Sequence, residues 1–164
     1  MGTGEPVKIG SIGTVDEVRL ALARAMEEIF ATMFNEAASI IPHEEIKDAP
    51  RMTAIVGFAG RLSGLLCLHL SSAMACNIAS GLLGMPVSHV DETVRDAIGE
   101  MSNMLAGGMK NHLSNIDNMF KIAIPSVIEG SEYTVHAPVD AHHLWMGVAA
   151  GKCRFKIQLV LQQQ

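Results

Sequence analysis

The segments of this chain that are rich in β-forming apolar residues come in pairs, instead of alternating one by one with helices. One pair is 52–59 and 65–70, and another is 143–150 and 153–161. Strands that are joined by short turns pair antiparallel, whereas a parallel sheet needs a long crossover after each strand. We therefore expect an α/β chain of the α+β type, in which a mainly antiparallel sheet of about six strands carries three main helices.

The helices are expected where apolar residues recur with a helical period and where capping residues mark the ends. Three segments meet both conditions: one that opens with the Thr14-x-x-Glu17 capping box and reaches 37, one at 73–83 between Ser72 and Gly84, and one from about Asp91 to about Leu113. Two further extended segments are 120–128 and 133–136. Pro125 lies inside the first of these. Because proline cannot donate to a β-ladder, we expect an edge strand or a bulge there.

The 164 residues carry 12 basic and 17 acidic side chains, a net charge of −5 at pH 7, and we expect one domain, residues 1–164. No Lys/Arg cluster occurs, which argues against nucleic acid as a partner, and no apolar run is long enough to span a membrane. The first residues lack the pattern of a secretion signal, so we expect a cytoplasmic protein. Cys67, Cys76 and Cys153 lie far apart in apolar runs, so we expect buried thiols and no metal site.

The third predicted helix separates apolar from polar residues. At about 100° per residue, one narrow stripe of its surface carries Asp96, Glu100, Asn103, Gly107 and Lys110. The apolar residues of the segment fall on the opposite face, so the helix can bury that face and expose the stripe. A carboxylate pairs with a cation, and a carboxamide donates and accepts at once, so that it can orient a water molecule. The stripe is therefore suited to hydrolysis if a partner supplies the remaining groups.

The polar motif extends beyond this helix. Asp96, Glu100 and Asn103 are followed by Pro125, 22 residues after Asn103. This spacing resembles the signature of the CheC/CheX/FliY family of chemotaxis phosphatases, and the sequence around the four residues is similar to CheX in particular. Pro125 is interpreted as a structural residue that interrupts a strand near the stripe.

Two further positions bear on this resemblance, one as a distinction between branches and one as a departure from the pattern. CheC-type members usually carry two such motifs, whereas here Glu27 and Glu28 of the first helix are followed, three residues later, by Phe30 and Ala31 instead of an amide. With a single motif, the chain resembles the CheX branch of the family. Ser102 stands where the family often has a glycine before the asparagine.

The resemblance implies a substrate, a mechanism and partners. The substrate is the phosphorylated aspartate of a CheY-like response regulator, whose receiver domain supplies Mg²⁺, so that no cofactor is expected in this chain. Asn103 would position the attacking water, and Glu100 would pair with the lysine of the receiver's active site. Asp96, Gly107 and Lys110 are candidate contacts to the receiver, and a homodimer joined through sheet edges is expected. The response regulator, and whether it serves chemotaxis or another two-component system, stays open.

Two other functions stay open from the sequence. A non-catalytic adaptor related to the flagellar-switch proteins would bind receiver domains without accelerating the loss of phosphate. A small-ligand sensor would need a convergent polar pocket, which the sequence does not indicate. The patterns of a serine hydrolase and of a phosphate-binding loop do not occur.

The remaining histidine and aromatic residues are interpreted as structural. His142 and His143 are neighbours on a predicted strand, so their side chains point to opposite faces and are not expected to share a metal. His112 lies on the apolar side of the third helix and is expected to be packed. Trp145 and Phe155 are expected to fill the packed face of the sheet.

Overall fold

The computed structural model describes residues 9, 13–113, 120–130, 133 and 136–162. Three α-helices, one short 3₁₀ helix and seven strands make up this part of the chain. The helices are α1 (Val15–Met33), α2 (Ser72–Leu83) and α3 (Glu92–His112), and the 3₁₀ helix is η1 (His43–Glu45). The strands are β1 (Ser39–Ile41), β2 (Met52–Gly60), β3 (Gly64–Leu70), β4 (Phe120–Ile122), β5 (Ser126–Glu129), β6 (His142–Ala150) and β7 (Cys153–Leu161).

The strands form one antiparallel sheet in the order β1-β6-β7-β3-β2-β4, and β5 pairs with β2 beside β4. The two predicted hairpins, β2–β3 and β6–β7, are confirmed, and β7 pairs with β3 to join them. The fold is therefore the expected α+β arrangement, with β1 as an additional strand that the sequence did not indicate. β1 occupies the edge opposite to β4 and β5.

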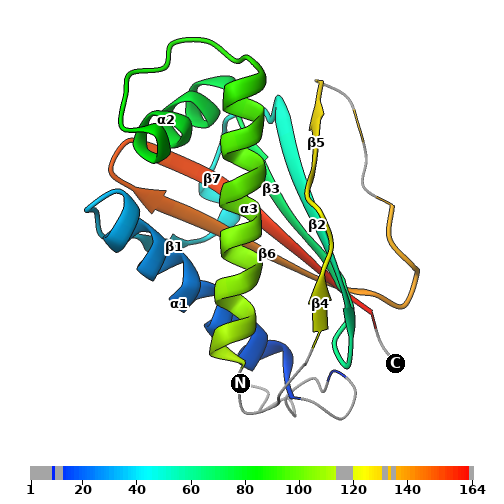
Figure 1. Cartoon of the computed structure of the whole chain (residues 1–164). Coiled ribbons are helices and arrows are strands. Elements are labelled where there is room, and N and C mark those ends of the chain that lie inside the picture. Colours follow the sequence, from blue (N-terminus) through cyan, green and yellow to red (C-terminus); the bar gives the residue numbers. More distant parts are fainter. Residues whose placement is uncertain (1–8, 10–12, 114–119, 131–132, 134–135, 163–164) are drawn as a thin grey trace.

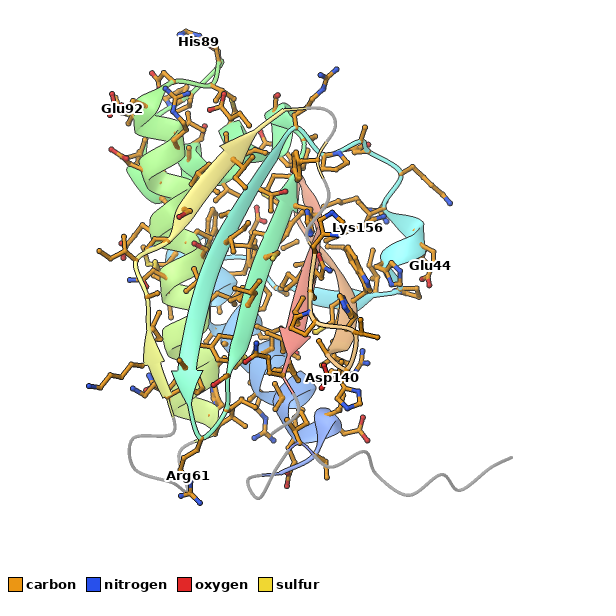
Figure 2. The ribbon with its side chains drawn as sticks, turned by 90° about the vertical axis from the view of Figure 1, so that its right-hand side faces the viewer. Glu44, Arg61, His89, Glu92, Asp140 and Lys156 are labelled. Carbon is orange, nitrogen blue, oxygen red and sulfur yellow. The ribbon has the colours of Figure 1, made fainter. Side chains whose placement is uncertain are left out.

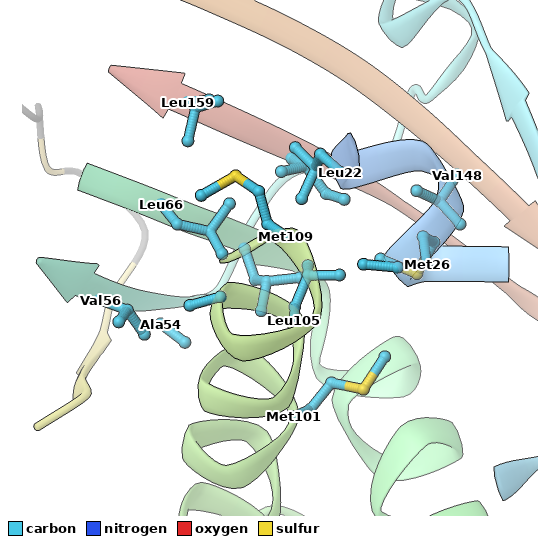
Figure 3. Packing of buried hydrophobic residues seen from close by; sticks show 14 of the residues in the cluster. Leu22, Met26, Ala54, Val56, Leu66, Met101, Leu105, Met109, Val148 and Leu159 are labelled. Carbon is cyan, nitrogen blue, oxygen red and sulfur yellow. The ribbon is translucent and has the colours of Figure 1, made fainter. Parts of the chain in front are cut away.

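The three helices cover one face of the sheet (Figure 1), with α3 lying across its middle next to β4 and β5. Seen from the side (Figure 2), α3 and the η1 segment that carries Glu44 lie on opposite sides of the sheet. Buried side chains of α1, α3 and the strands fill the space between the layers (Figure 3); among them are Leu22, Met26, Val56, Leu66, Met101, Leu105, Met109, Val148 and Leu159. Burial of these apolar residues is the main source of stability for the fold.

Capping residues fix the helix ends. Thr14 and Glu17 form both bonds of the predicted capping box: the Thr14 N–H donates to Glu17 Oε2 at 2.7 Å, and Thr14 Oγ1 accepts from the Glu17 N–H at 3.2 Å. Gly84 ends α2 in the left-handed conformation, with φ +66°. The prediction of Ser72 as the α2 cap is wrong by one residue, because Ser71 has the extended backbone and accepts the Met74 N–H.

The predicted segment 120–128 contains a bulge at Pro125. Ile122 pairs with Phe58 and Ser126 pairs with Ile55, so three residues, 123–125, face only two residues of β2. The Ala123 N–H still donates to Gly57 O at 2.8 Å, which leaves Ile124 and Pro125 as the bulged positions. A bulge accepts proline because the ladder bond is already interrupted there. The structure therefore splits the predicted strand into β4 and β5.

Three other expectations are wrong. The first helix ends at Met33 instead of near 37, because Phe34 caps it and Asn35 takes a positive φ of 52°. No strand occurs at Tyr133 or His136, while 134–135 lie outside the described residues. Trp145 does not fill the helix-covered face: its ring stacks between His43 and His69 on the other face, whereas Phe155 is buried as expected.

Candidate functional site

The predicted stripe of α3 lies at the surface. The apolar face of α3 is buried against α1 and the sheet, and the helix begins where Asp91 Oδ1 accepts the Val94 N–H at 3.0 Å. With that face fixed, Asp96, Glu100 and Asn103 are exposed. The helix phase predicted this exposure, and the structure confirms it.

Glu100 and Asn103 are free to meet a partner. Within the described part of the chain, neither side chain forms a hydrogen bond or an ion pair. They are three residues apart on one helix, so their side chains are neighbours. A carboxylate and a carboxamide are thus presented together on a rigid element, with all their hydrogen-bonding capacity available.

Pro125 supports the helix beside these two residues. A Cβ atom placed on Gly99 would lie 3.7 Å from Pro125 Cγ and 3.9 Å from Val127 Cγ2, so the proline ring packs close to the helix backbone. Asn103 follows Gly99 by four residues, which puts its side chain on the same side of α3, toward the bulge. The structural role expected of Pro125 agrees with this contact.

The stripe continues toward the C-terminal end of α3. A Cβ atom on Gly107 would meet no atom within 4 Å, so the space above this residue is open. Lys110 is half-buried, and its Nζ lies 5.8 Å from the centre of the Phe120 ring in β4. This cation–π contact holds Lys110 against β4, so that it is less available to a partner than Asp96 is.

Contacts at both ends of α3 hold the helix in place. Near its start, Arg95 Nη1 lies 2.6 Å from Glu129 Oε1 of β5. At its end, His112 Nε2 lies 2.8 Å from Glu28 Oε1 of α1, so His112 is half-buried in contact with α1. Ser102, the departure from the family pattern, is fully buried and donates to Gly99 O at 2.7 Å. Its hydroxyl is satisfied inside the helix and leaves the exposed stripe unchanged.

The other face of the sheet carries a chain of hydrogen bonds that sequence reasoning missed. His69 Nε2 donates to Gln158 Oε1 at 2.9 Å, and the Gln158 amide donates to His143 Nδ1 at 3.2 Å. In the neutral ring, His69 Nδ1 accepts from the Thr53 hydroxyl at 2.9 Å, and Thr53 also bonds Tyr133. These residues come from four strands and one loop, so no local sequence pattern predicts that they lie together.

A cavity of about 300 Å³ adjoins this chain of hydrogen bonds. It is lined by Ile46, Asp48, Pro50, His69, Ser71, Tyr133, Trp145, Arg154, Phe155, Lys156 and Gln158. An apolar groove of about 550 Å³ lies nearer to the β2–β3 turn. None of the stripe residues lines either space, so the stripe lies outside both.

The cysteine thiols are not suited to act as nucleophiles. The pKa of Cys67 and of Cys153 is raised to about 11 by burial, so both thiols stay protonated at neutral pH. Among the described residues, no three His, Cys, Asp or Glu side chains are grouped so that they could hold a metal ion. No helix in the same residues is long and apolar enough to cross a membrane.

The fold is that of the CheC/CheX/FliY class. A crystal structure of a chemotaxis protein CheX from Vibrio vulnificus superimposes with a TM-score of 0.76 at 20% identity, covering 89% of this chain and 97% of that one. The CheX of a CheX–CheY–BeF₃–Mg²⁺ complex from Borrelia burgdorferi gives a TM-score of 0.71 at 17% identity over 93% and 99% of the two chains.

The family itself is identified by sequence. Residues 52–149 match the family model described as chemotaxis phosphatase CheX, and the chain belongs to this family. The CheY-P phosphatase CheX of Thermotoga maritima is 30% identical over 98 residues. This match spans 59% of the present chain and 62% of the relative, which is less than two thirds of that protein.

Proposed function

We propose that this protein is a phosphatase that removes the phosphoryl group from the aspartyl phosphate of a CheY-like response regulator. The observation that carries the proposal is the exposed, unpaired pair of Glu100 and Asn103 on the rigid helix α3. The named activity of the Thermotoga maritima relative and the CheX–CheY complex of Borrelia burgdorferi support it.

In this mechanism the present chain positions the attacking water, and the receiver domain supplies the metal ion that neutralises the phosphoryl group. An acyl phosphate is already reactive, and Mg²⁺ bound by the receiver neutralises the phosphoryl oxygens. The Asn103 carboxamide enters the receiver's active site and orients a water molecule in line with the bond to the aspartate. The water oxygen attacks phosphorus, the phosphorus–carboxylate bond breaks, and inorganic phosphate leaves the aspartate behind.

Glu100 orients the helix in the receiver. Its free carboxylate pairs with the lysine of the receiver's active site in a charge-assisted hydrogen bond. Because Glu100 and Asn103 are adjacent on one helix, this pairing also fixes where the carboxamide lies. Asp96 and the open surface at Gly107 extend the contact along α3, and Lys110 borders it.

The decisive experiment mixes this protein with phosphorylated response regulators of the same genome in the presence of Mg²⁺ and times the loss of phosphate. We expect one or more of them to lose phosphate faster than by self-hydrolysis, and Glu100→Ala and Asn103→Ala to abolish the acceleration without changing the melting temperature. Phosphorylation-dependent binding without acceleration would instead show an adaptor. Wild-type rates in both variants would show that the site is elsewhere.

The homodimer and the cytoplasmic location stay expectations under this proposal. Among the described residues, the sheet ends at β1 on one side and at β4 and β5, next to α3, on the other. An edge-to-edge dimer through β1 would leave α3 open to the receiver. Light scattering during size-exclusion chromatography would measure the mass of the assembly.

A further inference from the structure

The bulge between β4 and β5 exposes an isoleucine beside the reactive stripe. Ile124 is 90% exposed, although the residues on either side of it are engaged with the rest of the protein. The Ala123 N–H donates to Gly57 O at 2.8 Å, and the Pro125 ring packs toward Gly99 of α3. The backbone at Ile124 is therefore held in one conformation while its side chain lies in solvent.

A single exposed apolar side chain is common on protein surfaces and by itself indicates nothing. Ile124 differs because of its place and because the backbone on both sides of it is held. Pro125 contacts the helix at Gly99, one turn before Asn103, so the bulge adjoins the part of α3 that carries the carboxamide. A segment whose backbone is already fixed loses less conformational freedom when a partner covers it than a flexible loop does.

The two charged side chains of β4 and β5, Lys121 and Glu129, do not oppose burial of Ile124 under a partner. Glu129 in β5, the nearest strand after the bulge, is paired with Arg95 of α3 at 2.6 Å. The charge of Glu129, at the far end of β5, is thus compensated within the chain, and a partner surface that covers this edge would not have to neutralise it. Lys121, on β4, is exposed and can keep its ammonium group in water at the rim.

We propose that Ile124 is an apolar anchor that inserts into a depression on the receiver domain beside its phosphorylation site. This inference rests on the proposed function and names a second part of the surface, besides α3, that contributes to affinity for the receiver. The division of labour is then spatial: Glu100 and Asn103 enter the reaction centre from α3, and Ile124 contacts the receiver from the neighbouring bulge. Ile124 contributes binding and takes no part in the chemical step.

The test compares Ile124→Ser with Ile124→Leu, using a phosphorylated receiver that the wild-type protein dephosphorylates. Loss of a buried aliphatic side chain from an interface predicts a rise in KM of about tenfold for Ile124→Ser. We expect kcat to stay at the wild-type value, and Ile124→Leu to restore most of the affinity. Both variants should keep the wild-type melting temperature, because the side chain does not contribute to the core.

Ile40 offers a matched control. It is the same residue type, is 37% exposed, and lies in β1 at the opposite edge of the sheet. Ile40→Ser should leave KM unchanged, because β1 lies at the other edge of the sheet from the bulge, and size-exclusion chromatography checks that the variant keeps the wild-type assembly state. An unchanged KM in Ile124→Ser, or a fall in kcat at unchanged KM, would overturn the anchor. If Asn103→Ala abolishes activity in the same experiment, the proposed phosphatase function stands even when the anchor fails.

Discussion

Gly108 of α3 lies so close to α1 that a Cβ atom placed on it would be 2.8 Å from the Cβ of Ala25. Its neighbour Gly107 has nothing within 4 Å of the same position. The two adjacent glycines therefore serve different purposes. Gly108 permits two helices to pack closely, whereas Gly107 keeps a stretch of the exposed helix surface flat.

Alanine substitutions at the two glycines should change stability in opposite directions. Gly107→Ala replaces a poor helix former in open space and should raise the free energy of unfolding by up to about 1 kcal/mol. Gly108→Ala forces α1 and α3 apart, and we expect a loss of about 1–3 kcal/mol. Urea unfolding followed by circular dichroism measures both. Equal effects in the two variants would contradict the packing of α3 on α1 described above.

Glu100→Gln, a milder change than Glu100→Ala, and Asn103→Ala should affect different kinetic constants. Asn103→Ala removes the group proposed to orient water and should lower kcat about a hundredfold or more, a loss on the order of 3 kcal/mol. Glu100→Gln keeps the shape of the side chain but removes the charge that pairs with the receiver's lysine, so KM should rise. Steady-state release of phosphate from a receiver that is continuously rephosphorylated separates the two effects.

Asn111 provides the control for Asn103. It is an exposed amide on the same helix, about 12 Å further along the axis and outside the stripe. Asn111→Ala should retain full activity. A similar loss in both variants would indicate a general effect on α3.

The buried thiols should resist alkylation in the folded protein. Burial raises the pKa of Cys67 and Cys153 to about 11, so at pH 8 roughly one thiol in a thousand is ionised. We expect iodoacetamide to modify these two residues only after urea has unfolded the chain, as peptide mass spectrometry would show. Fast modification of the native protein would mean that the sheet opens far more readily than its packing implies.

His69 should make the protein less stable in acid. Burial lowers its pKa from the ordinary value of 6.5, and the nearby positive charge of Lys156 acts in the same direction, against the hydrogen bond to Gln158. Below about pH 6.5 the unfolded chain therefore binds a proton that the folded chain does not bind, so the free energy of unfolding falls as the pH falls toward the pKa of the folded state.

The variant His69→Gln isolates this contribution, because the other six histidines are unchanged. Urea unfolding at pH 7.5 and at pH 5.5 should show a smaller loss of stability in the variant than in the wild-type protein. The same loss in both proteins would mean that the His69 ring is not held neutral by its surroundings.

Local patterns in the sequence were enough to predict most helices and strands and to predict which residues of the stripe are exposed. The phase of α3 predicted which side chains are exposed, and the Thr14 capping box, the two hairpins and the bulge at Pro125 all depend on neighbouring residues. β1 escaped prediction because it has three residues and is defined by its pairing with β6, more than a hundred residues away. A segment of three residues is too short to show the alternation of apolar and polar residues that predicts a strand.

Trp145 shows a different limit. Alternation along β6 correctly places Trp145 with His143 on one face, but alternation does not say which face the helices cover. The outer face is itself partly covered by the η1 segment, so a large aromatic residue is accommodated there by stacking on His43 and His69. The hydrogen-bonded chain through Thr53, His69 and Gln158 could not be predicted either. These residues lie on different strands, and only the pairing of those strands in the folded sheet brings them together.

Ile124, in the bulge, lies where a change of side chain affects the surface but not the packing of the fold. Because the Ile124 side chain has no share in the interior, its identity can drift without disturbing the sheet or the helix beside it. If Ile124 is the proposed anchor, exchanging this one amino acid changes which signalling partner a protein with this scaffold recognises, while the proposed catalytic residues on α3 stay the same.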